Sequence, residues 1–167
     1  YGGTSLSIKQ GENWTKVVGP FLIYCNAANS PPAMWKDALA QAGKESSKWA
    51  YDWVSGADFP NNKNRGEISG QIILSDSPNS KMSNLLVGLS APDYEVSNSR
   101  SRTEQIGWQN DAKNYEFWTR GTNDGKFTMS KIRPGKYTLH AIADGVLGEY
   151  YKTDVTVEAG KLLNFGK

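Results

Sequence analysis

The stretch that decides the fold spans residues 118–160 and reads WTRGTNDGKFTMSKIRPGKYTLHAIADGVLGEYYKTDVTVEAG. Its apolar residues alternate with polar ones, and this period of two is typical of strands with one solvent-exposed face. Three turn pairs separate the alternating runs, namely Asp124-Gly125, Pro134-Gly135 and Asp144-Gly145. The stretch therefore predicts a meander in an antiparallel β-sandwich, an architecture that more often binds or spaces than catalyses.

Further strands are predicted before the meander. Ile68, Ile72 and Leu74 open the sandwich, and residues 85–89 and 115–119 add two more strands. About seven short strands in about 100 residues is the size of an immunoglobulin-like or fibronectin type III-like module. Residues 75–84 and 91–111 are predicted to be loops, and the second is long enough to be either mobile or functional.

The first third of the chain follows other patterns. Residues 6–8 and 17–23 read as two strands, and the second is apolar on both faces, so it needs packing partners that two strands cannot supply alone. From Ser30 to Val54 the apolar period becomes about 3.6, which predicts a helix begun by Asn29 or Ser30 and stopped by Gly56. The stripe of this helix contains Trp35, Leu39, Ala42, Ser46, Trp49 and Trp53.

Composition excludes several classes of function. The net charge is only +2 and no run of basic residues occurs, so the sequence predicts no nucleic-acid partner. No apolar run reaches the roughly 20 residues of a membrane span, so no membrane partner is predicted. One histidine, His140, and one cysteine, Cys25, predict neither a metal site nor a cofactor. The 6 Trp and 8 Tyr suit either stacking on sugars or a sandwich core.

A more informative ionisable pair flanks Trp14 in the phrase GENWTK of residues 11–16. Glu12 and Lys16 lie where a polar turn leads into the predicted second strand, so both side chains could reach the edge of a groove. An amine whose pKa is lowered by burial or by positive neighbours can act as a base. A solvated turn with an ordinary ion pair explains the same residues.

Several phrases resemble one family. YGGTSL of residues 1–6, GENWTKVVGP of residues 11–20 and Tyr24 are similar to the end of the catalytic domain of rhamnogalacturonan endolyases, polysaccharide lyase family 4. The helical stretch 35–53, residues 65–70, FWT of residues 117–119 and RPGKYTL of residues 133–139 continue the resemblance into that family's fibronectin type III-like second domain. The resemblance covers nearly the whole chain.

The resemblance implies an activity for a parent protein. Enzymes of this family cleave rhamnogalacturonan I, the pectin backbone of alternating rhamnose and galacturonic acid, by β-elimination. The reaction needs a base for the C5 proton of the uronate, positive charge for the enolate-like intermediate and an acid for the leaving oxygen. In the family a lysine and a histidine upstream of the matched region fill these roles, and His140 is not that histidine.

The resemblance also implies a domain layout. Residues 1–28 would be terminal strands of the catalytic domain, residues 29–64 a helix and linker, and residues 65–167 the sandwich. The chain is then a noncatalytic spacer in a secreted or periplasmic lyase, with an upstream catalytic domain and a downstream carbohydrate-binding domain as partners. The alternatives are a carbohydrate-binding module, in which Trp108, Tyr94 or Trp118 would stack on sugars, or a structural domain.

The candidate site residues are few. Glu12 and Lys16 are the candidate catalytic residues, and Tyr1, Trp14 and Trp108 are the candidate substrate-binding residues. No residue is predicted to bind a metal.

Overall fold

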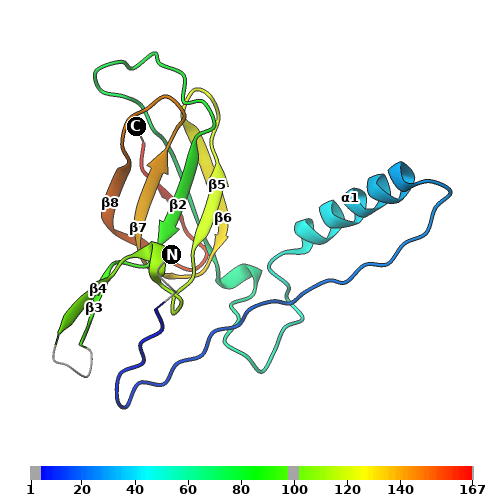
Figure 1. The fold of residues 1–167 in the computed structure, drawn as a ribbon, viewed down its shortest axis with the longest axis horizontal. Coiled ribbons are helices and arrows are strands. Elements are labelled where there is room, and N and C mark those ends of the chain that lie inside the picture. Colours follow the sequence, from blue (N-terminus) through cyan, green and yellow to red (C-terminus); the bar gives the residue numbers. More distant parts are fainter. Residues whose placement is uncertain (1–4, 98–101, 167) are drawn as a thin grey trace. The chain divides into compact units, whose positions relative to one another are not determined.

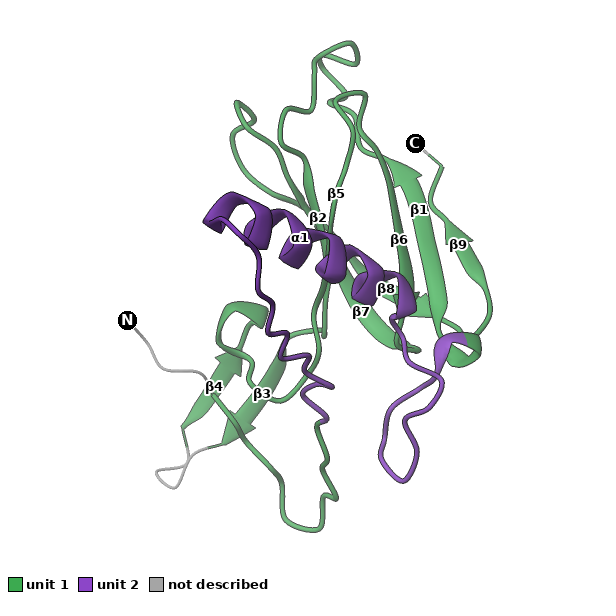
Figure 2. Cartoon of the chain, turned by 90° about the vertical axis from the view of Figure 1, so that its right-hand side faces the viewer, with its two compact units in different colours: residues 1–16, 63–167 green, residues 17–62 purple. Residues whose placement is uncertain are grey.

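The computed structural model describes residues 5–97 and 102–166. The chain forms two compact units (Figure 2). The sandwich unit consists of residues 1–16 and 63–167, and the helical unit consists of residues 17–62.

Two sheets of the sandwich unit form the sandwich itself (Figure 1). A three-stranded sheet has the order β6 (Lys126–Ile132), β1 (Gly66–Gln71), β9 (Leu162–Asn164). A four-stranded sheet has the order β5 (Phe117–Arg120), β2 (Leu86–Ser90), β7 (Gly135–Ile142), β8 (Tyr150–Val157). All neighbours pair antiparallel except β1 and β9, which are parallel. The predicted mainly β, antiparallel sandwich is confirmed.

The core lies between the inward faces of the two sheets. Strand β6 alternates buried and exposed residues, as the period of two predicts, whereas the central strands β2 and β7 have runs of consecutive buried residues and are covered on both faces. The core residues include Ile68, Val87, Leu89, Phe127, Met129, Ile132, Tyr137, Leu139, Val155 and Val157. Tyr137 lies near the start of β7, and its hydroxyl donates to the backbone oxygen of Arg133 at 2.7 Å. This is the tyrosine-corner geometry of immunoglobulin-like sandwiches.

The prediction that residues 118–160 form one meander is wrong. Only β7 and β8 pair as a hairpin, whereas β5 and β6 belong to different sheets. The turns at Asp124-Gly125 and Pro134-Gly135 therefore each carry the chain from one sheet to the other. Gly125 has a φ of +84°, and a Cβ there would lie 2.0 Å from the oxygen of Ile72, so the tight turn requires glycine.

The predicted loop 91–111 contains secondary structure. Strands β3 (Tyr94–Ser97) and β4 (Thr103–Ile106) form a separate antiparallel ribbon, followed by a 3₁₀ turn, η2 (Trp108–Asn110). The ribbon is mainly polar; Tyr94 and Val96 of β3 are half-buried, and Ile106 of β4 is buried. Its Ser-, Asn- and Arg-rich composition therefore looks like that of a loop in the sequence.

The two predicted strands in residues 6–8 and 17–23 are not formed. In the described part of this region the only β-bridge joins Ser5 to Asp111. Phe21 and Ile23 are 80% and 89% exposed. The physical reason is pairing, because an extended segment becomes a strand only when a neighbour supplies its backbone hydrogen bonds.

The helical unit contains helix α1 (Pro31–Lys48), which is shorter than predicted. Ser30 caps it, and its side chain accepts a hydrogen bond from the Ala33 N–H at 3.4 Å. The helix ends before Trp49, whose backbone is extended, so Trp49 and Trp53 are not on a helical stripe. The ring of Trp49 instead packs edge-on against Phe59, with a centroid distance of 5.5 Å. Tertiary ring contacts override the helical period here.

No residue of α1 is buried within the described chain. The preceding segment is tied to the helix by polar contacts. The Tyr24 hydroxyl donates to Asp37 Oδ2 at 2.7 Å, and Asn26 Nδ2 donates to the same oxygen at 3.0 Å. Both bonds help to lower the pKa of the Asp37 carboxyl, with the bond from Asn26 contributing most.

Candidate functional site

The N-terminal segment of the sandwich unit is anchored to the loop that precedes β5. The Ser5 N–H donates to the Asn110 oxygen at 2.6 Å, and the Ala112 N–H donates to the Ser5 oxygen at 3.0 Å. Further along, Trp14 Nε1 donates to the Lys113 oxygen at 3.2 Å. Segment 5–16 thus runs beside loop 111–115, far from it in sequence, and we call this arrangement the N-terminal anchor.

Lys16 makes the densest contacts in the anchor. Its Nζ donates to the Ala112 oxygen at 2.8 Å and to the Asn114 oxygen at 2.6 Å. The same ammonium lies 5.4 Å from the centre of the Tyr115 ring, within the range of a cation–π contact. Two of the three N–H donors of Lys16 are therefore occupied by main-chain carbonyls of the loop.

Glu12 faces a different cation. Its carboxylate forms an ion pair with Lys113 Nζ, and its second oxygen accepts the Lys9 backbone N–H at 3.0 Å. The hydrogen bond from Lys113, followed by that from Lys9, holds the pKa of the Glu12 carboxyl below its ordinary value. Glu12 is thus held as a carboxylate, and it reaches the same loop that Lys16 binds.

Asp111 organises that loop. One oxygen, Oδ1, accepts hydrogen bonds from the Lys113 N–H at 2.7 Å and from the Tyr94 hydroxyl at 3.1 Å. Its other oxygen accepts from Asn114 Nδ2 at 2.8 Å. Burial, followed by the bond to Asp111, raises the pKa of Tyr94 to about 12. The anchor therefore rests on a turn that is already fixed by its own side chains.

The structure brings together three of the predicted site residues. Glu12, Trp14 and Lys16 all contact loop 111–115. Tyr1 lies outside the described residues. Trp108 lies elsewhere, on the outward face of the four-stranded sheet, where its ring packs on Trp118 with centroids 5.2 Å apart.

Trp108 lines a hollow of about 420 Å³ on that outward face. The residues around it come from β2, η2, β5, β7 and the β7–β8 connection, and they are Leu86, Trp108, Trp118, His140, Ala141, Ile142 and Glu149. We call this feature the tryptophan hollow. The cross-strand register sets it up, because Gly88 of β2 lies opposite Trp118 on one side and His140 on the other.

Gly88 makes room for the tryptophan. A Cβ at this position would lie 2.3 Å from the ring of Trp118, so the ring occupies the space that a side chain would fill. Trp118 is 36% exposed, and its Nε1 donates to Glu116 Oε2 at 2.9 Å. The ring is thus held against the sheet with part of its surface open to solvent.

A buried row of polar side chains ends in the hollow, and the sequence did not reveal it. His140 Nδ1 lies 2.5 Å from Glu149 Oε1, and His140 Nε2 lies 2.9 Å from Ser90 Oγ. The Ser90 hydroxyl also donates to the Ala91 oxygen at 3.1 Å. Because a carboxylate only accepts, the His140 ring donates to Glu149 through Nδ1. The only signal in the sequence is the alternation of residues 137–142, which places His140 on the same face of the strand as Thr138 and Ile142.

This order of bonds is that of a Ser-His-acid triad, yet Ser90 cannot act as its nucleophile. Ser90 is 1% exposed and lies within the regular strand β2, so its hydroxyl has no access to a substrate. The row of Ser90, His140 and Glu149 instead positions a carboxylate. Ser90 fixes the ring of His140, which in turn fixes the carboxylate of Glu149 at the rim of the hollow.

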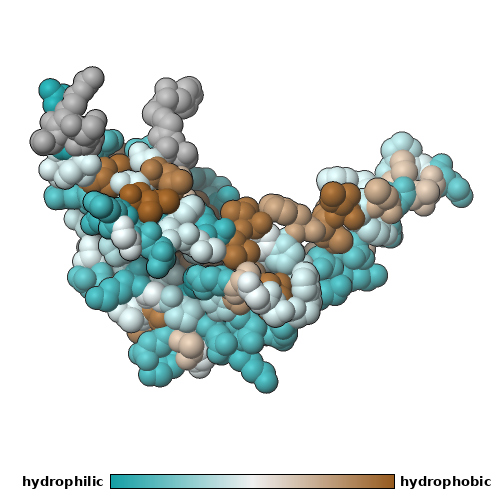
Figure 3. Space-filling model, turned by 90° about the horizontal axis from the view of Figure 1, so that it is seen from below, coloured by the Kyte–Doolittle hydropathy of each residue, from teal (hydrophilic) through white to brown (hydrophobic). Residues whose placement is uncertain are grey.

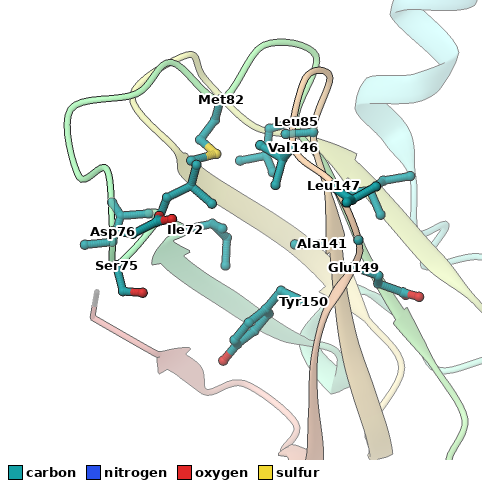
Figure 4. Close-up of a pocket in the computed structure, with 15 residues that line it drawn as sticks. Ile72, Ser75, Asp76, Met82, Leu85, Ala141, Val146, Leu147, Glu149 and Tyr150 are labelled. Atoms are coloured by element: carbon teal, nitrogen blue, oxygen red, sulfur yellow. The ribbon is translucent and has the colours of Figure 1, made fainter.

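A second cavity, of about 430 Å³, lies at one end of the sandwich. Figure 4 shows Met82, Leu85 and Val146 at one side of it and Tyr150 at the other. Ser75 and Asp76 add polar groups from the loop after β1. The lining is mainly aliphatic, and it continues the core toward the loops.

The described residues, 5–97 and 102–166, contain no group of three or more His, Cys, Asp or Glu side chains placed to hold a metal ion. Within the same ranges no helix has both the length and the apolar character needed to cross a bilayer.

Comparison with known proteins identifies the sandwich. Residues 64–164 match the family model described as polysaccharide lyase family 4, domain II. This chain belongs to polysaccharide lyase family 4. The match contains every strand of the two sheets, so the domain II of this family and the sandwich described above coincide.

Individual relatives are similar to this chain, and one of them matches more than the residues of the sandwich. A rhamnogalacturonate lyase of Dickeya dadantii is 28% identical over 148 residues, which are 87% of this chain and 22% of that protein. A probable rhamnogalacturonate lyase B of Neosartorya fischeri is 43% identical over 47 residues, 28% of this chain and 7% of that protein. A protein of the same name from Aspergillus flavus is 35% identical over 52 residues, 31% of this chain and 8% of that protein. The chain thus spans about a fifth or less of the length of these relatives.

Proposed function

We propose that this chain is a noncatalytic spacer and support region of a rhamnogalacturonan I lyase. The observation that carries the proposal is the N-terminal anchor. Lys16, the candidate base, donates two hydrogen bonds to main-chain carbonyls of the sandwich unit, and Glu12 forms an ion pair with Lys113. Both candidates hold the segment that enters domain II, which is the task of a support and not of a base.

The lyase would carry its chemistry outside this region. The relatives named as rhamnogalacturonate lyases are about four times as long as this chain, so each has room for a catalytic domain and a further domain. We propose that an upstream domain supplies the lysine and histidine that perform β-elimination, and that a downstream domain binds carbohydrate. A parent enzyme of this kind would be secreted or periplasmic, where pectin is accessible.

The exposed apolar residues support an adjoining domain. Trp35 and Leu39 of α1 are exposed, as are Val18, Phe21, Leu22 and Ile23 of the segment before it. Figure 3 shows such residues (brown) among the polar surface of the molecule. Large apolar side chains gathered in one segment mark surfaces that another part of a protein covers. We propose that the catalytic domain covers them, with residues 17–23 as one of its strands.

The test is a lyase assay on rhamnogalacturonan I with two proteins, this chain and a longer protein that contains it. The readout is the ultraviolet absorbance of the unsaturated uronate product. The longer protein should form product, and this chain should form none. The longer protein should also keep its activity when Lys16→Met is introduced. Product formation by this chain that disappears with Lys16→Met or Glu12→Gln would overturn the proposal and make the anchor an active site.

A further inference from the structure

We infer that the tryptophan hollow is a binding subsite for a neutral 6-deoxyhexose residue, the class of sugar to which rhamnose belongs. The inference deepens the proposed function, on which the choice of polysaccharide rests. All residues that line the hollow lie in the sandwich unit, so this unit forms the hollow by itself.

The walls of the hollow fit the faces of a pyranose. Trp108 and Trp118 meet at an interplanar angle of 55°, which makes a wedge with two aromatic faces. The C–H face of a sugar ring stacks on one such face, and aromatic side chains are the groups best suited to that contact. Ile142 is 46% exposed and Leu86 lies beside it in the lining, so an apolar wall continues next to the rings.

The apolar wall favours a deoxy sugar. A hexose with a hydroxyl at C6 would lose the hydration of that group against Ile142 without gaining a partner, which costs free energy. A methyl group at C6 gains contact area instead. The wall therefore selects a sugar with one apolar edge.

The rim selects a neutral sugar. Glu149 is the acidic residue of the lining, and His140 holds one of its oxygens at 2.5 Å. His140 bonds to Oε1 and leaves the other oxygen, Oε2, at the rim, where a carboxylate oxygen can accept sugar hydroxyl protons. A galacturonate carboxylate at the same place would face a fixed negative charge in a partly desolvated hollow, which disfavours it.

The buried row explains why the carboxylate is held. Ser90 and His140 are both buried, and a hydrogen-bonded network in the interior holds its members rigidly. By holding Oε1, the row leaves Glu149 in a single orientation before the sugar arrives. Such pre-organisation reduces the entropy that binding must overcome.

The test is a titration of the 167-residue chain with methyl α-L-rhamnopyranoside and, separately, with galacturonic acid. The indole N–H signals of Trp108 and Trp118 are followed by nuclear magnetic resonance. We expect the rhamnoside to shift both signals and the uronic acid to leave them in place. The variant Glu149→Gln should admit galacturonic acid, because it removes the charge and keeps the shape.

Two variants locate the site. Trp118→Ala and Ile142→Ser should each weaken rhamnoside binding about tenfold or more. The side chain of Ile142 is exposed, so we expect Ile142→Ser to keep the protein folded even if Trp118→Ala unfolds it. The matched control is Trp35→Ala, which removes an exposed tryptophan of the helical unit and should leave binding unchanged.

Three outcomes would overturn the inference. These are signals that do not move with the rhamnoside, equal binding of galacturonic acid by the unaltered chain, and equal losses from the Trp35 and Ile142 variants. The experiment measures binding without catalysis, so its failure leaves the spacer role intact. Conversely, a longer protein without lyase activity would refute the proposed function and leave the binding result standing.

Discussion

Replacing Lys16 with methionine tests the N-terminal anchor most directly. Methionine keeps the apolar stem of the side chain but removes the ammonium that donates to the Ala112 and Asn114 oxygens at 2.8 and 2.6 Å. A hydrogen bond from a charged donor contributes roughly 1.5–3 kcal/mol. Lys16 is partly exposed, so water can replace part of this contact, and we expect a net loss of about 2–3 kcal/mol for the pair of bonds.

The loss should be local, since the anchor joins segment 5–16 to a loop and contributes nothing to the core. The informative signals are the amide hydrogens of Ser5 and Ala112, which bond across the anchor. A local opening that becomes about 2–3 kcal/mol easier raises their exchange rates about 30- to 150-fold. Amides of β7 should exchange at unchanged rates.

The matched control is Lys136→Met, which alters an exposed lysine of β7. It should leave the Ser5 and Ala112 amides unaffected. An increase of less than about threefold in the Lys16→Met protein would refute the anchor, because a free-energy change that small is below 1 kcal/mol. A response of equal size in both variants would show that the lysine contacts are not specific.

Three further predictions concern the sandwich. Ile68→Ala truncates a fully buried core side chain, so urea denaturation should show a loss of about 2–5 kcal/mol in the free energy of unfolding; a loss below 1 kcal/mol would contradict the core assignment. Tyr137→Phe removes the hydrogen bond to the Arg133 oxygen and should cost about 1–2 kcal/mol in the same assay, whereas an unchanged midpoint would refute the tyrosine corner. Burial raises the pKa of Tyr137 to about 12 and, with a bond to Asp111, that of Tyr94 to about 12, from an ordinary value of 10.0. The unfolded chain therefore releases these protons before the folded chain does, so stability is complete below pH 10 and falls as the pH rises from about 10 to 12. A phenolate absorbance titration in which all tyrosines ionise together near pH 10 would contradict both values.

Much of the local structure could be predicted from the sequence. The alternation in residues 126–142 predicted β6 and β7, and in β6 the period of apolar residues records which face of the strand is buried, whereas β7 is buried on both faces. Ser30 before two prolines predicted the start of α1, since a hydroxyl can cap the first turn and proline needs no N–H there. Asp124-Gly125 predicted a tight turn for the same local reason, the positive φ that glycine adopts.

The partition of the strands into sheets depended on tertiary structure. Alternation shows one buried face but does not show which neighbour supplies the backbone hydrogen bonds. For this reason β5, β6 and β7 read as one meander, although the turns between them cross from sheet to sheet. The strands predicted in residues 6–8 and 17–23 failed for a related reason, since apolar character alone cannot provide a pairing partner.

The sequence by itself determined the strand and turn pattern of the sandwich and the phrases that place it in polysaccharide lyase family 4. Only the tertiary structure decided what the candidate residues contact. Lys16 and Ala112 are 96 positions apart, and Ser90 and His140 are 50 apart, so no local pattern links them. Their contacts arise from the packing of the N-terminal segment against its loop and from the register of β2 against β7. Short-range periodicity reflects the burial of each residue, whereas a site reflects distances that only the complete set of strand pairings fixes.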